Sequence, residues 1–215
     1  PNLLTCDLVC HGVPSPAVFR AYLDGLEAAR GSRAVSVRFK DKSHGWAHPW
    51  FTVQFADGSV YTEDFNRTGY GRGFGMQLFL RPACARCRYT STSRPADFTL
   101  ADYWGLDEKL ALPVERDKGV SMVLVNSARG QAVFDALSPR FGQVERPLAE
   151  AVAGNPRLAS PLKANPRRAA FFAAFAALPF NEVEKRFLAL PSLPYRAAAK
   201  ALTPAMKEKI RKLLK

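Results

Sequence analysis

Four cysteines stand in two groups along this 215-residue chain. Cys84 and Cys87 form a C-x-x-C pair in a polar segment that also carries four arginines, while Cys6 and Cys10 lie near the start. Two thiolates at the C-x-x-C spacing can hold one side of a metal site, and neighbouring guanidinium groups oppose the negative charge of a thiolate-bound metal or cluster. On spacing alone, structural zinc, an iron-sulfur cluster and thiols that bind nothing all remain open, because structural zinc normally takes a second pair of ligands.

The residues near the first two cysteines allow simpler interpretations. Cys6 lies within an apolar run and is interpreted as a packed small side chain, because free cysteine is among the most buried residue types. His11 could serve as a ligand, but it is interpreted as a loop-capping residue. Trp46 with His44 and His48 could stack on a planar ligand, but we interpret them as an aromatic cluster at the solvent edge. Four cysteines are too few to stabilise a secreted protein of this size by disulfide bonds, so reduced thiols in a cytoplasmic protein are expected.

The hydrophobic pattern predicts the elements that position the thiols. Residues 3–9 form a short apolar run, which predicts a buried strand with Cys10 at its carboxyl end. Ser15 and Pro16 then provide a helix N-cap and a proline at the first helical position, and an apolar stripe predicts a helix that stops at Gly31. The other predicted elements are a strand over 35–39, an antiparallel hairpin over 50–65, strands over 97–103 and 120–126, of which the second is expected to be central, and a helix over 129–137.

Two segments between these elements are predicted to be loops. Residues 69–75 contain four glycines, and the segment is interpreted as a flexible connection because it matches neither of the common phosphate-binding glycine motifs. Residues 81–94 hold the C-x-x-C pair and show no hydrophobic period, so something other than side-chain packing must organise them. We expect an α/β fold with a mixed β-sheet and flanking helices over 1–147, and a helical carboxyl-terminal portion with a basic amphipathic tail over 148–215.

The charge of the chain is strongly positive but unevenly spread. Lysine and arginine number 31 against 19 acidic residues, giving a net charge of +12. Half of this excess lies in residues 195–215, which contain seven basic residues and one glutamate. Nucleic-acid binding through this tail is therefore the weakest of the functional hypotheses. The longest apolar stretch, residues 169–178, is too short to cross a bilayer, so no transmembrane segment is expected.

Four runs of residues, taken in order, resemble one known family. They are DLVCHGVPSP from Asp7, LRPACARC from Leu80, RPADFTLADYWG from Arg94 and KGVS from Lys118. Together they resemble the carboxyl-terminal region of the coenzyme F420 hydrogenase/dehydrogenase beta-subunit family, over roughly residues 3–175. The resemblance implies an enzyme, a flavin- and iron-sulfur-dependent oxidoreductase that binds FAD and a 4Fe-4S cluster. Its implied partners are a redox protein or ferredoxin-type domain and a small-molecule hydride carrier, such as a deazaflavin.

The resemblance also assigns cofactor residues. It implies Cys10, Cys84 and Cys87 as cluster ligands, with a fourth cysteine expected from sequence upstream of this chain, which we interpret as a fragment. Cys6 stands where the family usually has an aliphatic residue, so it is expected to be a bystander. A flavin needs aromatic walls, backbone amides and a positive charge. The residues that supply these types, and that we assign to the flavin pocket, are Asp102, Trp104, Lys118, Gly119 and Ser121.

A second hypothesis needs no enzyme. In this alternative, Cys84 and Cys87 belong to a structural zinc site, and the tail from Lys207 to Lys215 docks a partner as a basic amphipathic helix. The two hypotheses differ in whether a flavin and an iron-sulfur cluster bind to the protein.

Overall fold

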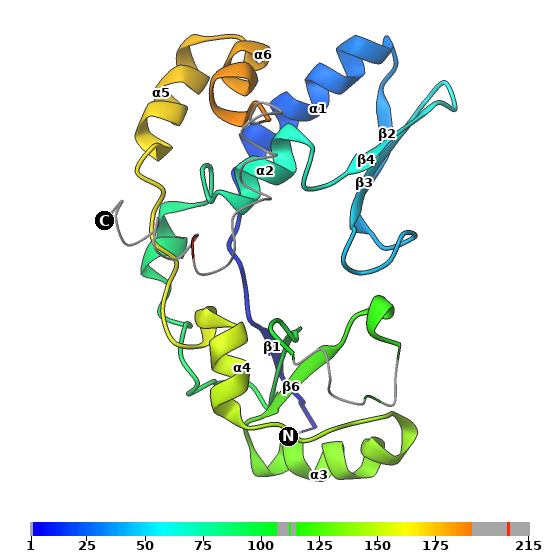
Figure 1. Ribbon diagram of the computed structural model, residues 1–215, viewed down its shortest axis with the longest axis vertical. Helices are drawn as coiled ribbons and strands as arrows, with labels where there is room; N and C mark the ends of the chain where they lie inside the picture. The colour runs from blue at the N-terminus through cyan, green and yellow to red at the C-terminus, as the bar shows by residue number, and fades with distance from the viewer. Residues whose placement is uncertain (1, 107–111, 113–114, 191–205, 207–215) are drawn as a thin grey trace.

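The computed structural model describes residues 2–106, 112, 115–190 and 206. These residues form two lobes (Figure 1). The hairpin lobe contains an antiparallel sheet, and the mixed-sheet lobe contains a sheet of parallel and antiparallel pairs. Within the described residues, the chain passes between the lobes before α1 (Pro16–Arg30), between α2 (Gly69–Gly75) and β5 (Phe98–Asp102), and between α4 (Leu148–Gly154) and α5 (Arg168–Ala177).

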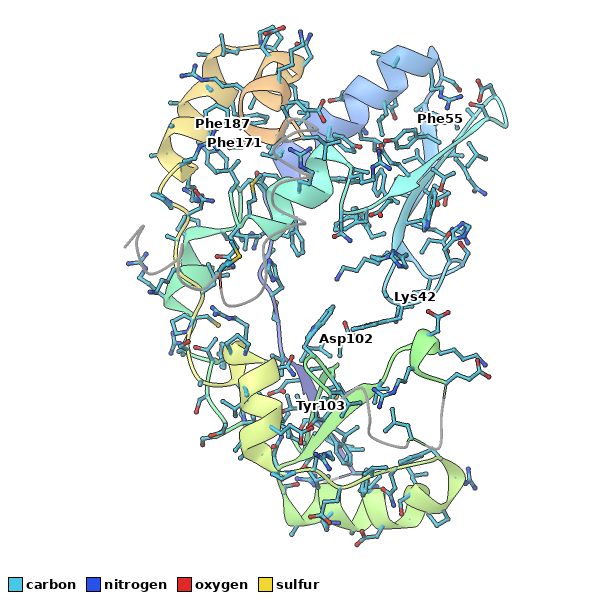
Figure 2. The ribbon with its side chains drawn as sticks, in the orientation of Figure 1. Lys42, Phe55, Asp102, Tyr103, Phe171 and Phe187 are labelled. Carbon is cyan, nitrogen blue, oxygen red and sulfur yellow. The ribbon has the colours of Figure 1, made fainter. Side chains whose placement is uncertain are left out.

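The hairpin lobe is built as the sequence predicts. Its sheet has the order β2 (Ala34–Asp41), β3 (Trp50–Phe55) and β4 (Val60–Asp64), with both pairs antiparallel. The helix α1 starts at Pro16 and ends at Gly31, whose φ of +67° allows the left-handed cap that glycine favours. Its buried face packs with β3 and with aromatic side chains of α5 into one core (Figure 2).

The glycine-rich segment is a helix, so the prediction of a flexible loop is wrong. The Thr68 hydroxyl accepts a hydrogen bond from the backbone N–H of Gly71 at 2.9 Å and so caps the amino terminus of α2. A Cβ at Gly71 would overlap the carbonyl oxygen of Phe65, and one at Gly73 would overlap the Phe79 ring. The glycines therefore allow the helix to lie against its neighbours, and this packing offsets their low helix propensity.

The mixed-sheet lobe confirms the expected α/β fold class. Its sheet has the order β1 (Cys6–Leu8), β5 and β6 (Ser121–Val125), with β1 parallel and β6 antiparallel to β5. The helix α3 (Ala128–Leu137) follows β6 as predicted, and its amino terminus is capped by the Ser127 hydroxyl. Met122 of β6 is buried with Ala151 of α4 and Leu158 in a small second core.

Two details of this sheet differ from the predictions. β6 is an edge strand of the three, whereas its apolar run predicts a central strand, and β5 takes the central place. β1 is largely exposed rather than buried, since Leu8 is 65% exposed. Leu8, Leu100 and Val123 lie in one register row across the sheet and all are exposed, so the continuous apolar run of β6 reflects one packed and one open face.

The helices beyond residue 147 belong to both lobes. α4 contributes to the small core of the mixed-sheet lobe, while α5, α6 (Phe180–Val183) and the π-helical turn Glu184–Leu188 pack into the hairpin-lobe core. The remaining short turns are 3-10 helices at Pro82–Arg86, Arg116–Lys118, Ser138–Arg140 and Pro156–Leu158. The division at 147 stays a prediction, and the basic tail lies outside the described residues apart from Met206.

Among the described residues, every helix is too short or too polar to cross a membrane.

A buried carboxylate ties the start of the chain to the mixed sheet. Asp97 accepts hydrogen bonds from the Ser127 hydroxyl and from the backbone N–H and hydroxyl of Thr5, and it pairs with Arg129 at 3.5 Å. These contacts, the Ser127 hydroxyl first, lower the pKa of Asp97 to about 2. One side chain therefore holds the residues before β1 against the amino terminus of α3.

The glycines of α2 give a prediction with a control in the same helix. Gly71→Ala should destabilise the protein by about 1–3 kcal/mol, because the added methyl group overlaps the Phe65 carbonyl. Gly75→Ala meets nothing within 4 Å and should raise the free energy of unfolding by about 0.5–1 kcal/mol through its higher helix propensity. Urea unfolding checks both values. Equal effects of the two substitutions would contradict the packing argument.

The Asp97 contacts predict a pH dependence. Because the folded-state pKa lies below the usual value of 3.8, the carboxylate stabilises the fold above about pH 4, and this contribution is lost as the pH falls toward 2. Asp97→Asn should lower the thermal midpoint at pH 7 and flatten its decline between pH 4 and 2. Asp135→Asn changes an exposed carboxylate on α3 and serves as the control. A midpoint of Asp97→Asn that matches wild type throughout this range would contradict the prediction.

Candidate functional site

The two cysteine-bearing segments lie side by side where the chain passes between the lobes. Ser15 N–H donates to the carbonyl of Phe79 at 2.9 Å, and Arg81 N–H donates to the carbonyl of Val13 at 2.8 Å. Pro14 and Leu80 form the antiparallel bridge between these two bonds. We call residues 13–15 and 79–81 the crossover pair. It places the Cys10 loop and the C-x-x-C loop next to each other although they are about 70 residues apart in sequence.

The crossover pair extends to the C-x-x-C loop through a sulfur. Cys84 lies in the 3-10 turn Pro82–Arg86, and its Sγ accepts a hydrogen bond from Val13 N–H at 3.3 Å. Such backbone N–H donors stabilise a thiolate that binds metal or a cluster. On the other side, the His11 ring packs on Phe74 at 4.7 Å between centroids, with Nε2 3.2 Å from the Phe74 carbonyl, and so ties the Cys10 loop to α2.

The thiols themselves are unpaired but not gathered around one point. All four cysteines are free, with Cys6 and Cys10 exposed and Cys84 and Cys87 partly buried. In the part of the chain that the structure describes, no three His, Cys, Asp or Glu side chains are close enough together to hold one metal ion. The interpretation of Cys6 as a packed side chain is wrong, because β1 is too exposed to enclose it. The donor types therefore suit a thiolate-bound cofactor, while the ligand set requires movement of exposed side chains.

The arginines of the C-x-x-C loop have two different roles. Arg81, Arg86 and Arg88 are exposed around the cysteines. The Arg94 side chain is 4% exposed and forms an ion pair with Asp7 at 2.9 Å. It also donates to the carbonyls of Leu8 and Tyr89, which fastens the end of this loop to β1. Three of the four arginines thus remain available to offset negative charge at the thiols, and the fourth holds the loop.

An aromatic pocket lies where the β2–β3 loop meets the ends of β5 and β6. It has a volume of about 180 Å³ and is lined by Trp46, Tyr103, Trp104, Gly105, Leu106, Arg116 and Val120. The Trp46 and Trp104 rings pack at 4.5 Å between centroids with a tilt of 40°. Burial, and the hydrogen bond that the Tyr103 hydroxyl donates to Glu150, raise the pKa of Tyr103. Figure 2 shows Asp102 on the side of the mixed-sheet lobe that faces the β2–β3 loop, which carries Lys42.

Trp46 makes three contacts across the gap between its loop and the mixed sheet. Its indole Nε1 donates to Asp102 Oδ1 at 3.0 Å, its backbone N–H donates to the carbonyl of Asp117 at 2.7 Å, and its ring packs on Trp104. Gly119 provides the space for it, since a Cβ there would lie 2.7 Å from Trp46 Cδ1. The expectation that Trp46 lies at a solvent edge therefore misses its role as a wall of the pocket.

The five residues assigned to a flavin pocket fall into two sets. Asp102, Trp104 and Gly119 come together around Trp46. Ser121 is paired with Asp102 across the β5–β6 ladder, whereas Lys118 is exposed and pairs with Glu115 at 3.2 Å. The assignment of all five to a flavin stays a prediction. Trp46 is one of the lining residues that the sequence did not assign to the flavin, although its place between His44 and His48 is a local signal for stacking on a planar ligand.

These features define an α/β protein with thiols on two paired loops and an aromatic pocket between two lobes. Over residues 1–145, the sequence matches the family model for the C terminus of the coenzyme F420 hydrogenase/dehydrogenase beta subunit. The match covers more than half of the chain, which therefore belongs to this family. Searches of curated proteins and of solved structures found no match.

The space under Trp46 gives a testable prediction. Gly119→Ala should displace the Trp46 indole, because the new methyl group would lie 2.7 Å from its ring, and the tryptophan fluorescence maximum should shift to longer wavelength. Gly58→Ala also places an alanine at a positive φ, +82°, but with nothing within 4 Å, so it should leave the emission unchanged and serves as the control. Unchanged emission in Gly119→Ala would contradict the close packing of Trp46.

Proposed function

We propose that this chain is the cofactor-binding part of an oxidoreductase that uses FAD and a 4Fe-4S cluster. Membership of the coenzyme F420 hydrogenase/dehydrogenase beta-subunit family supports a redox role. The single observation that carries the proposal is the crossover pair, because it brings the Cys10 loop beside the C-x-x-C loop. The aromatic pocket supports the flavin part independently.

The proposed cluster ligands are Cys10, Cys84 and Cys87. Their thiols are free, and Val13 N–H already donates to Cys84 Sγ, which is the kind of bond that favours a ligating thiolate. The exposed guanidinium groups of Arg81, Arg86 and Arg88 would offset the charge of a thiolate-bound cluster. A fourth ligand would come from another segment or another chain.

The proposed flavin site is the pocket between Trp46 and Trp104. When bound, a flavin exchanges hydride with a small-molecule carrier and single electrons with a cluster. The residues of this chain would bind and orient its ring, with Trp104 offering an aromatic face and Asp102 a hydrogen-bond acceptor. The substrate that we propose is a deazaflavin or a similar hydride carrier, and the electron partner is an iron-sulfur protein or domain.

Cysteine substitutions test the cluster proposal. Anaerobic reconstitution of the chain with iron and sulfide should give broad visible absorbance. Cys10→Ser, Cys84→Ser and Cys87→Ser should each lower bound iron and sulfide by more than half, because each removes one ligand. Cys6→Ser is the matched control and should bind as much iron as wild type, since Cys6 lies on the exposed strand β1.

The result that would overturn the cluster proposal is equally specific. A colourless protein that binds one zinc ion per chain, and that unfolds on Cys84→Ser, would favour the structural-zinc alternative. Equal loss of iron in Cys6→Ser and Cys10→Ser would contradict the ligand assignment but not the presence of a cluster.

A further inference from the structure

Trp46 contacts one lining residue of the aromatic pocket, Trp104, and the Asp102 carboxylate that lies next to the lining. The indole is a flat fused ring with one N–H, and it presents that N–H to the Asp102 carboxylate at 3.0 Å while its face packs on Trp104. A carboxylate acceptor beside an aromatic surface is suited to a planar heterocycle that carries a ring N–H. A ligand that replaced Trp46 at these two groups would therefore be planar and aromatic and would carry a ring N–H.

The size of the pocket shows that one wall must move. Its volume of about 180 Å³ falls below the roughly 300–1,000 Å³ of pockets that enclose a drug-sized ligand. A fused three-ring heterocycle cannot enter while the Trp46 and Trp104 centroids are 4.5 Å apart, because a ring between them needs van der Waals contact on both faces. The pocket must therefore open before such a ligand binds.

The backbone behind the walls on the mixed sheet is fixed. Tyr103 N–H donates to the carbonyl of Val120 at 2.8 Å, which continues the β5–β6 pairing. The Trp104 carbonyl packs against Gly154 of α4 so closely that a Cβ there would overlap it. The backbone of Tyr103 and Trp104 therefore cannot shift without breaking the sheet or its packing on α4.

The Trp46 wall, in contrast, comes from a connection that is held through a few contacts of Gly45 and Trp46. Residues 42–49 join β2 to β3 without regular secondary structure, and most of their side chains are exposed. The β2–β3 register shifts between Arg38 and Asp41, just before this connection. The connection is attached to the mixed-sheet lobe through the contacts of Trp46 and the packing of Gly45 against Asp117. Breaking them frees the pocket while β3 stays paired.

We propose that Trp46 is the movable wall of this pocket and occupies the place of its ligand. That ligand is a planar fused heterocycle that replaces the indole: its ring N–H donates to the Asp102 carboxylate, and its face packs on Trp104. The inference rests on the proposed function, since a flavin belongs to this ligand class. It adds that the ligand displaces Trp46 rather than being enclosed by it, so that ligand and indole compete.

Riboflavin binding to the full chain tests this competition. Trp46→Ala should bind riboflavin about tenfold more tightly than wild type, because the competing stack and hydrogen bond are removed. Trp46→Phe retains a ring without the N–H and should lie between the two. Trp50→Phe alters a tryptophan of the same hairpin that packs on His44 at 4.5 Å outside the pocket, and it should leave the affinity unchanged.

Two further measurements do not depend on how well Trp46→Ala folds. N3-methylriboflavin lacks the ring N–H of riboflavin and should bind wild type about tenfold more weakly, because Asp102 loses its donor. In wild type labelled with 5-fluorotryptophan, riboflavin should move the Trp46 fluorine resonance toward the solvent-exposed position. The Trp50 resonance should stay in place.

The possible results separate this inference from the proposed function. Weaker riboflavin binding by Trp46→Ala, with a stationary Trp46 resonance, would overturn the inference and leave a flavin site intact. No binding of riboflavin by wild type or by Trp46→Ala would overturn both. Riboflavin binding that displaces Trp46 in a chain that never assembles a cluster or reduces a carrier would support the inference and overturn the proposed function.

Discussion

The arrangement of the molecule depends on the crossover pair. Two backbone hydrogen bonds, from Ser15 to Phe79 and from Arg81 to Val13, join segments that lead into different elements of both lobes. Gly12 stands beside this pair with a φ of +148°, and a Cβ there would lie 2.6 Å from Leu80 Cδ1. Backbone hydrogen bonds at a fixed register thus determine which side of the molecule each cysteine loop occupies.

Trp46 provides a second link between the lobes, away from the crossover pair. The crossover pair uses backbone bonds alone, whereas the Trp46 link combines one backbone bond to Asp117 with the contacts of the indole and the space that Gly119 leaves for it. The two proposed cofactor sites lie at these two links. Contacts that fix the lobes relative to each other therefore also shape the thiol loops and the aromatic pocket, so a change in lobe position would alter both sites together.

The parts of the fold that the sequence predicts are those determined by local signals. The start of α1 at Pro16, its cap at Gly31, and the alternation through β3 and β4 depend on residues within a few positions of one another. The helix over 69–75 could not be predicted, because its glycines serve contacts with Phe65, Phe79 and Leu188 that only the folded chain brings together. The role of Trp46 is hidden for the same reason, since Asp102 is 56 residues away.

Arg94 shows why charge counts in a sequence can mislead about a site. Four arginines around a C-x-x-C pair predict a positive environment for the thiols, and this holds for the three exposed ones. Arg94 instead directs its guanidinium to Asp7 and to the carbonyls of Leu8 and Tyr89, where its charge is balanced and its hydrogen bonds are used. Removing Asp7 would leave the charge of the buried Arg94 side chain uncompensated, so Arg94 contributes to the site by fixing the loop against β1 rather than by its charge.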